Sequence, residues 1–249
     1  MKRFYQTIIL MLGLTCIPSW LYAGILASQT RVIYSEGERE QTLMLANTNE
    51  YPILTQVWID DGSNNAEFEH APFVVLPAVF QMKPKDVKGI RLIFNGMELA
   101  KDRESLYWLN LYEIPAVKKQ DLEHDYLNLS MNTQLKVYFR PEALKVLPID
   151  EINRQLQFSF SDHRAQSAEI IIKNPTPFYV TAISLSLFNK TKQTTVYEWL
   201  NILLPPFESP LLKLENVDLN PSDAYVLKYH LIDDRGEVHA FEQAIPISK

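Results

Sequence analysis

Apolar and polar side chains alternate with a period of two through most of this chain, and that alternation is what most constrains its fold. Such a period places successive side chains on opposite faces of an extended strand, so each run predicts a strand with one face toward a core. β-branched and aromatic residues, which favour strands, dominate the runs. The clearest runs span residues 107–112, 127–132, 135–140 and 225–232. Shorter runs span residues 31–34, 42–48, 53–59, 90–94, 155–160, 169–173, 178–188 and 195–203.

The number and spacing of these runs predict an all-β protein built from two immunoglobulin-like sandwiches. No long amphipathic helix interrupts the runs, and short strands spaced by about 8–12 residues are typical of such sandwiches. About 15 strands exceed what one sandwich needs, whereas two sandwiches of about 100–120 residues each would use the length well. The strand pattern stops between Arg140 and Pro148, where two prolines bracket the break. We therefore expect an N-terminal domain at 24–144 and a C-terminal domain at 145–249.

The first residues have the order of a secretory signal. Two basic residues follow the first methionine, residues 7–14 form an apolar run, and Leu21-Tyr22-Ala23 provides a small-residue exit before Gly24. This order predicts a signal peptide at 1–23 that is cleaved after Ala23 by the ordinary secretory route. Removing 23 of the 249 residues would leave a mature chain of 226.

The composition after that cleavage excludes several classes of protein. The net charge falls from −6 to −8, because the leader holds two basic residues and no acidic one. A chain this acidic is a poor general binder of nucleic acid. No later segment has 18 uninterrupted apolar residues, so we expect no membrane insertion of the mature chain. The single cysteine, Cys16, lies in the leader, where the residues around it fit a lipoprotein acceptor poorly.

The sequence carries no motif that indicates an enzyme, a cofactor or a metal. It has no Gly-x-Ser-x-Gly elbow and no phosphate-binding glycine loop. No two of its histidines have a metal-ligand spacing such as His-x3-His. They are His70, His124, His163, His230 and His239. The carboxylate pairs Asp60-Asp61 and Asp233-Asp234 indicate solvated turns, although a glycosidase would need two carboxylates that only the fold brings together.

One predicted strand is unusually long. It spans residues 127–139, with Leu127, Leu129, Met131 and Leu135 as its inward positions, and a polar stretch at 118–125 precedes it. An alternating strand at an exposed edge can pair with another chain. Pattern alone leaves two interpretations open: an ordinary core strand, or a strand lent to a partner by β-augmentation.

Several motifs, in order along the chain, resemble those of the PapD-like family of periplasmic pilus chaperones. Thr30-Arg31-Val32 is similar to the opening strand of that family. The other motifs are Asp102-Arg103-Glu104-Ser105-Leu106-Tyr107-Trp108-Leu109-Asn110 followed by Ile114-Pro115, Lys136-Val137-Tyr138-Phe139-Arg140-Pro141, and Asn174-Pro175-Thr176-Pro177-Phe178-Tyr179. The resemblance covers residues 24–248.

This resemblance implies two immunoglobulin-like sandwiches set at an angle, with a cleft between them. It also implies a periplasmic chaperone that holds unfinished pilus subunits and delivers them to an outer-membrane usher. A subunit that lacks the last strand of its own sandwich has an open groove, and the chaperone would fill it with an edge strand, which is donor-strand complementation. Such a mechanism needs no ATP, metal or other cofactor, so the resemblance implies no enzymatic activity.

The resemblance assigns roles to particular residues. Arg31 and Lys136 match two basic residues that bind the C-terminal carboxylate of the subunit in the cleft. The residues that would enter the subunit groove are Leu127, Leu129 and Met131. Those that would form a charge bridge between the domains are Glu104, Arg140 and Asp234, with Asp233 as the competing register for the last. We expect this bridge to be exposed and therefore weak, at roughly 0–1 kcal/mol for each pair.

Two other classes of function remain as alternatives. A secreted two-domain β-sandwich adhesion or carbohydrate-binding protein would show exposed aromatic side chains in a shallow patch. A periplasmic hydrolase would show a pair of carboxylates in a deep pocket.

Overall fold

The computed structural model describes residues 24–116, 129–164, 167–215, 217 and 219–246, and it is almost entirely β. The first nine strands are β1 (Ile25–Ala27), β2 (Arg31–Ser35), β3 (Gln41–Asn47), β4 (Ile53–Asp60), β5 (Phe73–Leu76), β6 (Val79–Met82), β7 (Val87–Phe94), β8 (Ser105–Pro115) and β9 (Met131–Arg140). After the short helix α2 (Ile149–Gln155) come β10 (Gln157–Arg164), β11 (Ser167–Lys173), β12 (Val180–Asn189), β13 (Thr194–Leu204), β14 (Leu211–Glu215), β15 (Tyr225–Ile232) and β16 (Val238–Ala244).

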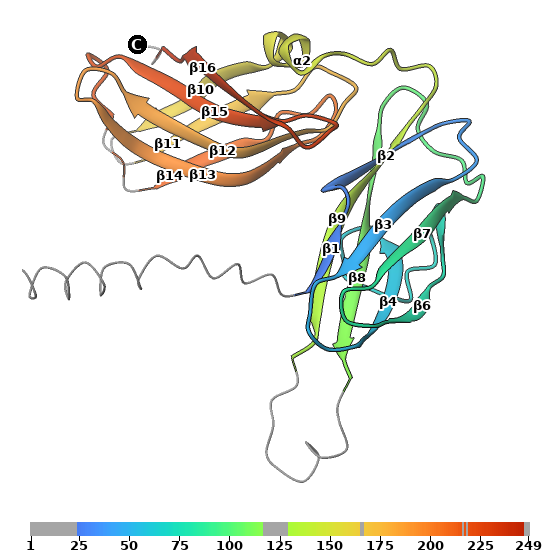
Figure 1. Ribbon diagram of the computed structural model, residues 1–249. Helices are drawn as coiled ribbons and strands as arrows, with labels where there is room; N and C mark the ends of the chain where they lie inside the picture. Colours follow the sequence, from blue (N-terminus) through green and yellow to red (C-terminus); the bar gives the residue numbers. More distant parts are fainter. Residues whose placement is uncertain (1–23, 117–128, 165–166, 216, 218, 247–249) are drawn as a thin grey trace, which may run out of the picture.

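The strands form two sandwiches. In the first, a sheet of order β1-β3-β7-β5 faces a sheet of order β2-β9-β8-β4-β6. In the second, a sheet of order β10-β11-β14 faces one of order β13-β12-β15-β16. Residues 141–148 and α2 join the two sandwiches, whose long axes lie at a steep angle to one another (Figure 1). The predicted fold class, all-β with two sandwich domains at an angle, is confirmed.

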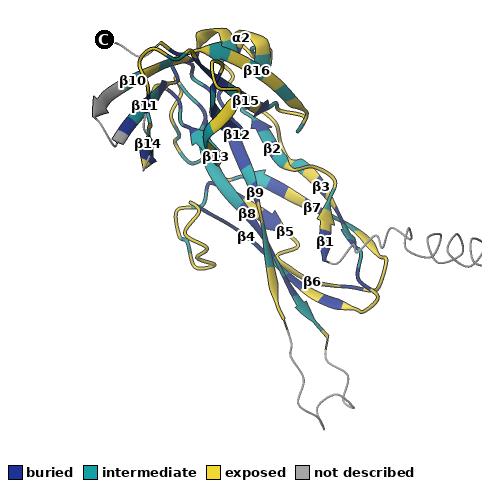
Figure 2. Ribbon diagram, turned by 90° about the vertical axis from the view of Figure 1, so that its left-hand side faces the viewer, coloured by how far each residue is buried: buried dark blue, intermediate teal, exposed yellow. Residues whose placement is uncertain are grey.

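Each sandwich has its own apolar core, formed by the inward positions of the alternating runs. In β3, for example, Leu43 and Leu45 are buried while Met44 between them is exposed. The first core also contains Leu109 and Val137, and the second is built around residues such as Leu187. Buried residues, coloured dark blue, recur along the strands of both sandwiches in Figure 2. Full burial of each such side chain contributes roughly 1.5–3 kcal/mol to the stability of its domain. Each domain is therefore stabilised by its own apolar core, without a disulfide.

The long strand predicted at 127–139 is shorter in the structure. The strand β9 begins at Met131, and Leu129 lies before it in irregular chain. The first predicted position of that strand, Leu127, lies outside the described residues. The alternation of apolar and polar residues in the sequence extends beyond the strand. A period of two indicates which side chains share a face, but not where backbone pairing begins.

Candidate functional site

A cavity of about 310 Å³ lies between the two sandwiches. Strands β2 and β9 and the residue before β8, Glu104, provide one wall of the cavity. The second sandwich and the chain leading into α2 provide the rest. Its lining includes charged side chains from both domains, namely Arg31, Glu104, Arg140, Asp233, Asp234 and Arg235. The fold therefore collects charged side chains of both domains in this cleft.

Arg31 and Lys136 are partners in register on the neighbouring parallel strands β2 and β9. The Nζ of Lys136 donates a hydrogen bond to the Thr181 Oγ1 of the second domain at 3.2 Å, and it lies 5.5 Å from the centre of the Trp108 ring. The Nε of Arg31 is buried without a hydrogen-bond partner. Among the described residues, neither cation forms an ion pair with a carboxylate.

Two adjacent cations that form no ion pair with any described carboxylate make this part of the cleft attractive to an anion. Burial, and to a lesser extent the charge of Arg31, lowers the pKa of the Lys136 ammonium to about 8. A bound carboxylate would relieve the repulsion, because it accepts charge-assisted hydrogen bonds from both side chains. The structure thus brings together the two basic residues that the sequence singled out, in a setting that suits a single carboxylate.

Polar contacts next to these cations tie the two domains together. The hydroxyl groups of Tyr138 and Thr181 lie 3.4 Å apart, and the rings of Tyr138 and Tyr179 are 5.8 Å apart. Burial raises the pKa of Tyr138 to about 12, so its hydroxyl stays protonated at neutral pH. Sequence reasoning missed Thr181 and Tyr138 because neither has a pattern that reveals contact across the cleft. The only signal was their position within or next to the quoted motifs.

Arg140 links the two domains through two carboxylates. Its guanidinium contacts Glu104 at 2.7 Å within the first domain and forms a bidentate pair with Asp234, at 2.7 and 3.0 Å. Glu104 in turn accepts a hydrogen bond from the backbone N–H of Tyr179 at 2.8 Å. The guanidinium carbon lies 5.2 Å from the centre of the Phe178 ring. The three residues expected to form a bridge therefore lie in contact, with Asp234 rather than Asp233 against Arg140.

The expectation that this bridge is exposed is wrong. The side chain of Arg140 is 9% exposed and that of Glu104 is 2% exposed, while Asp234 is half-exposed. Burial raises the pKa of Glu104 above its ordinary value, although the charge of Arg140 acts in the opposite direction. The sequence could not reveal this burial, because it arises only where the second sandwich packs against the first.

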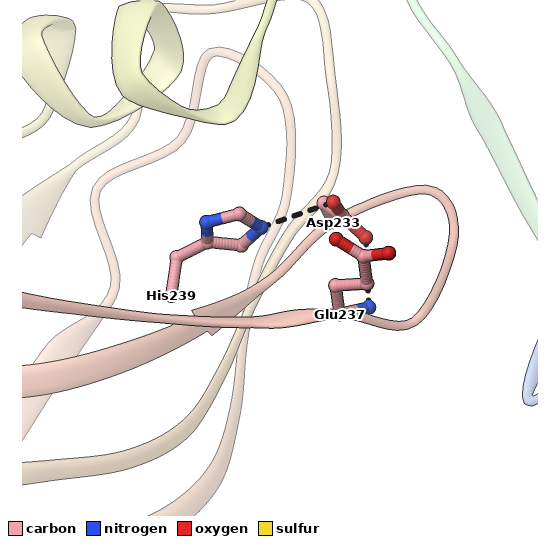
Figure 3. Close-up of side chains that lie close together, drawn as sticks. All are labelled: Asp233, Glu237 and His239. Carbon is pink, nitrogen blue, oxygen red and sulfur yellow. Dashed lines mark hydrogen bonds and ion pairs between the residues drawn. The ribbon is translucent and has the colours of Figure 1, made fainter.

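Asp233 stabilises the hairpin turn that carries Asp234. Its Oδ1 accepts hydrogen bonds from the backbone N–H groups of Arg235 and Glu237, and its Oδ2 contacts the Nε2 of His239 at 3.0 Å (Figure 3). The side-chain ligand atoms of Asp233, Glu237 and His239 lie within 4.8 Å of one another, close enough to surround a cation. The turn itself explains the contacts of Asp233, and we assign the group a structural role between β15 and β16.

The strand β9 has one open edge over its first half. It pairs with β8 from Met131 opposite Glu113 to Phe139 opposite Ser105. Its pairing with β2 begins only at Lys136. Within the described residues, no strand pairs with the other edge of residues 131–135. Leu129 and Met131 are 64% and 47% exposed, so two apolar residues are accessible to solvent beside this edge.

Comparison with known proteins identifies the family. Residues 24–145 match the description "Pili and flagellar-assembly chaperone, PapD N-terminal domain", and residues 151–243 match "Pili assembly chaperone PapD, C-terminal domain". The chain is 31% identical over 229 residues to the chaperone protein FimB/FhaD of Bordetella pertussis, which covers 90% of this chain and 88% of that protein. It is 33% identical over 217 residues to the chaperone protein FimC of Escherichia coli K12, which covers 86% of this chain and 81% of that protein.

Solved structures agree with this assignment. The YadV chaperone is similar with a TM-score of 0.71 and 28% identity, over 88% of this chain and 98% of that one. The structure of the Salmonella enterica SafA pilin in complex with the SafB chaperone is similar with a TM-score of 0.68 and 26% identity, over 90% of this chain and 97% of that one. The fold and cleft define a chaperone with two β-sandwich domains. This chain belongs to the PapD family of pili assembly chaperones.

Among the described residues, no helix is long and apolar enough to cross a lipid bilayer.

Proposed function

We propose that this protein is exported to the periplasm, where it binds unfinished pilus subunits and delivers them to an outer-membrane usher. Membership of the chaperone family supports this proposal, and so does the similarity to the SafB chaperone, whose structure is a complex with a pilin. A similar structure is that of the periplasmic chaperone SfaE, at 27% identity and a TM-score of 0.63. The leader at 1–23 would direct export and be removed after Ala23.

The single observation that carries the proposal is the position of Arg31 and Lys136. These adjacent cations form no ion pair with any described carboxylate, and they lie beside the open edge of β9. In this proposal the terminal carboxylate of a subunit binds both cations. A strand of the subunit then pairs with residues 131–135, immediately before Lys136 on the same strand. Anchoring the chain end fixes the register, because a slip of one residue would turn every apolar side chain to the wrong face.

Apolar side chains complete the proposed contact. Leu129 and Met131 lie two residues apart and would enter the open groove of the subunit, and we propose the same for Leu127. Burying each in the complex contributes roughly 1.5–3 kcal/mol. The Glu104–Arg140–Asp234 bridge would hold the two domains at the angle that the cleft requires. The protein would act by binding alone, without a chemical step.

The proposal is tested by copurification of subunits with chaperone variants from periplasm. Arg31→Ala and Lys136→Ala should each remain folded and exported but lose the subunit complex, because removing one partner of a desolvated charge pair costs about 3–5 kcal/mol. Arg31→Lys should also be impaired, since it lacks the planar fork of arginine.

Matched controls are Arg91→Ala and Lys190→Ala, which remove exposed cations that pair with Glu40 and Glu242 on other surfaces. Both should retain subunits at the wild-type level. Wild-type yields of complex with folded Arg31→Ala or Lys136→Ala would contradict the proposed anchor.

A further inference from the structure

Glu113 is a buried carboxylate that the proposed subunit site does not use. It lies on β8 and is 3% exposed. Its Oε2 accepts a hydrogen bond from the backbone N–H of Ile25 at 2.7 Å. Within the described part of the chain, no lysine, arginine or histidine forms an ion pair with it. Burial raises the pKa of this carboxyl, against the smaller effects of the Ile25 N–H and the Asn49 side chain, so the charged form is not compensated by a cation.

The backbone of Gly24 lies directly against this carboxylate. A Cβ added to Gly24 would stand 3.4 and 3.6 Å from the two oxygens of Glu113. Because the nitrogen of Gly24 is two bonds from that position, it lies within about 6 Å of both oxygens. The same nitrogen donates a hydrogen bond to the Oδ1 of Asn49 at 2.9 Å, and Asn49 is 3% exposed.

Further contacts hold Gly24 in this position. Its carbonyl oxygen accepts hydrogen bonds from the backbone N–H of Thr48 at 3.1 Å and from the Thr48 hydroxyl at 2.7 Å. Its φ of +112° lies in the region that favours glycine over other residues. The nitrogen of Gly24 is thus held against a buried amide oxygen, with the buried carboxylate of Glu113 within about 6 Å.

Cleavage after Ala23 would change the chemistry of that nitrogen. In the uncleaved chain it is a neutral amide with one N–H group. In the cleaved chain it is a primary ammonium with three donors and a positive charge. An opposite charge within about 4–6 Å favours the ionised form of both groups. An ammonium has three donors, so it can keep its bond to Asn49 with two donors left for the side of Glu113.

We propose that Asn49 and Glu113 form a binding site for the N-terminal ammonium group of Gly24, which exists only after the signal peptide has been removed. This inference rests on the export and cleavage contained in the proposed function. The ion pair fastens β1, whose pairing with β3 extends over only three residues, to the middle of the opposite sheet. It also lies close to the start of β9, because a Cβ added to Gly24 would stand 3.7 Å from the Cε of Met131. Removal of the leader therefore completes the first domain beside the strand proposed to bind subunits.

The first test is the pKa of the α-amino group in protein that begins at Gly24. A cytoplasmic fusion cut immediately before Gly24 supplies this protein without any need for export. Titration of ¹⁵N-glycine-labelled protein by NMR should give an α-amino pKa at least about one unit above the ordinary range of about 7.7–8.0. Glu113→Gln should return it to that range, whereas the exposed control Glu98→Gln should leave it raised. An ordinary α-amino pKa in the wild-type protein would overturn the inference.

The second test compares thermal unfolding of the Gly24 form with a form that retains Ala23. Glu113→Gln should lower the Tm of the Gly24 form by about 4 °C or more, and should change the Tm of the extended form little or raise it. Equal losses of Tm in both forms would show that Glu113 stabilises the fold without the ammonium and would overturn the inference.

These results are separable from the proposed function. A protein with the raised α-amino pKa that binds no subunit contradicts only the chaperone proposal. A protein that binds subunits with an ordinary α-amino pKa contradicts only this inference. A mature N-terminus other than Gly24, found by mass spectrometry of periplasmic protein, overturns the cleavage on which the ion pair depends.

Discussion

The proposed anchor predicts that binding of a subunit carboxylate weakens as pH rises through 8. In the free protein, burial and then the charge of Arg31 lower the pKa of Lys136 from its ordinary value to about 8. A carboxylate bound beside the ammonium favours the protonated form and raises that pKa again. Binding is therefore accompanied by proton uptake. Since the free protein loses this proton as pH rises, the affinity falls with increasing pH.

The size of the effect follows from the pKa of Lys136. If the complex keeps the lysine protonated, the Kd rises by a factor of about 10 between pH 7 and pH 9, which is about 1.4 kcal/mol. The neighbouring hydroxyl of Tyr138 does not titrate in this range, because burial raises its pKa to about 12.

Isothermal titration of a peptide with the C-terminal sequence of a subunit measures this change directly. An amidated peptide should bind more weakly and with less dependence on pH, which separates the carboxylate from all other titrating groups. Lys136→Arg should bind the free-acid peptide with an affinity that is nearly constant from pH 7 to 9, because arginine does not deprotonate. An equally steep pH dependence in Lys136→Arg, or none in the wild-type protein, would refute the reasoning.

Two further predictions concern the bridge and the apolar contact. Arg140→Ala should lower the free energy of unfolding by about 3–5 kcal/mol, because it leaves the buried charge of Glu104 without its partner. Asp234→Asn, at the half-exposed end of the bridge, should lower it by only roughly 0–1 kcal/mol. Chemical denaturation measures both, and equal small effects would argue against a buried bridge. Leu129→Glu should leave the Tm of the free protein nearly unchanged but abolish protection of subunits from aggregation. The control Leu200→Glu, at a similarly exposed position (66%), should retain protection. Unfolding of the free Leu129→Glu protein would mean that Leu129 is an ordinary core residue.

Much of the fold could be predicted because alternation records which face of a strand is buried. The run at 107–112, for example, lies within β8, where Leu109 and Leu111 are in the core. Alternation does not record where pairing begins, so the strand predicted at 127–139 starts at Met131. Periodicity predicted the strand at 135–140, but the placing of Lys136 beside Arg31 was anticipated only through the family resemblance.

The features that sequence reasoning missed depend on contacts between distant segments. The bridge at Arg140 is buried because a hairpin of the second domain supplies Asp234 from 94 residues away. Thr181 reaches Lys136 across the cleft in the same way. Glu113 and Ile25 are 88 residues apart, and only the closed sandwich brings the carboxylate to the start of the mature chain. None of these pairs produces a local pattern in the chain.

A crystal structure of the protein with a bound pilus subunit would show both proposed contacts at once. A strand of the subunit should pair with residues 131–135 of β9, and its terminal carboxylate should lie within ion-pair distance of both Arg31 and Lys136. A subunit held on another surface, or bound here with its carboxylate away from both cations, would mean that the cleft is not the anchor.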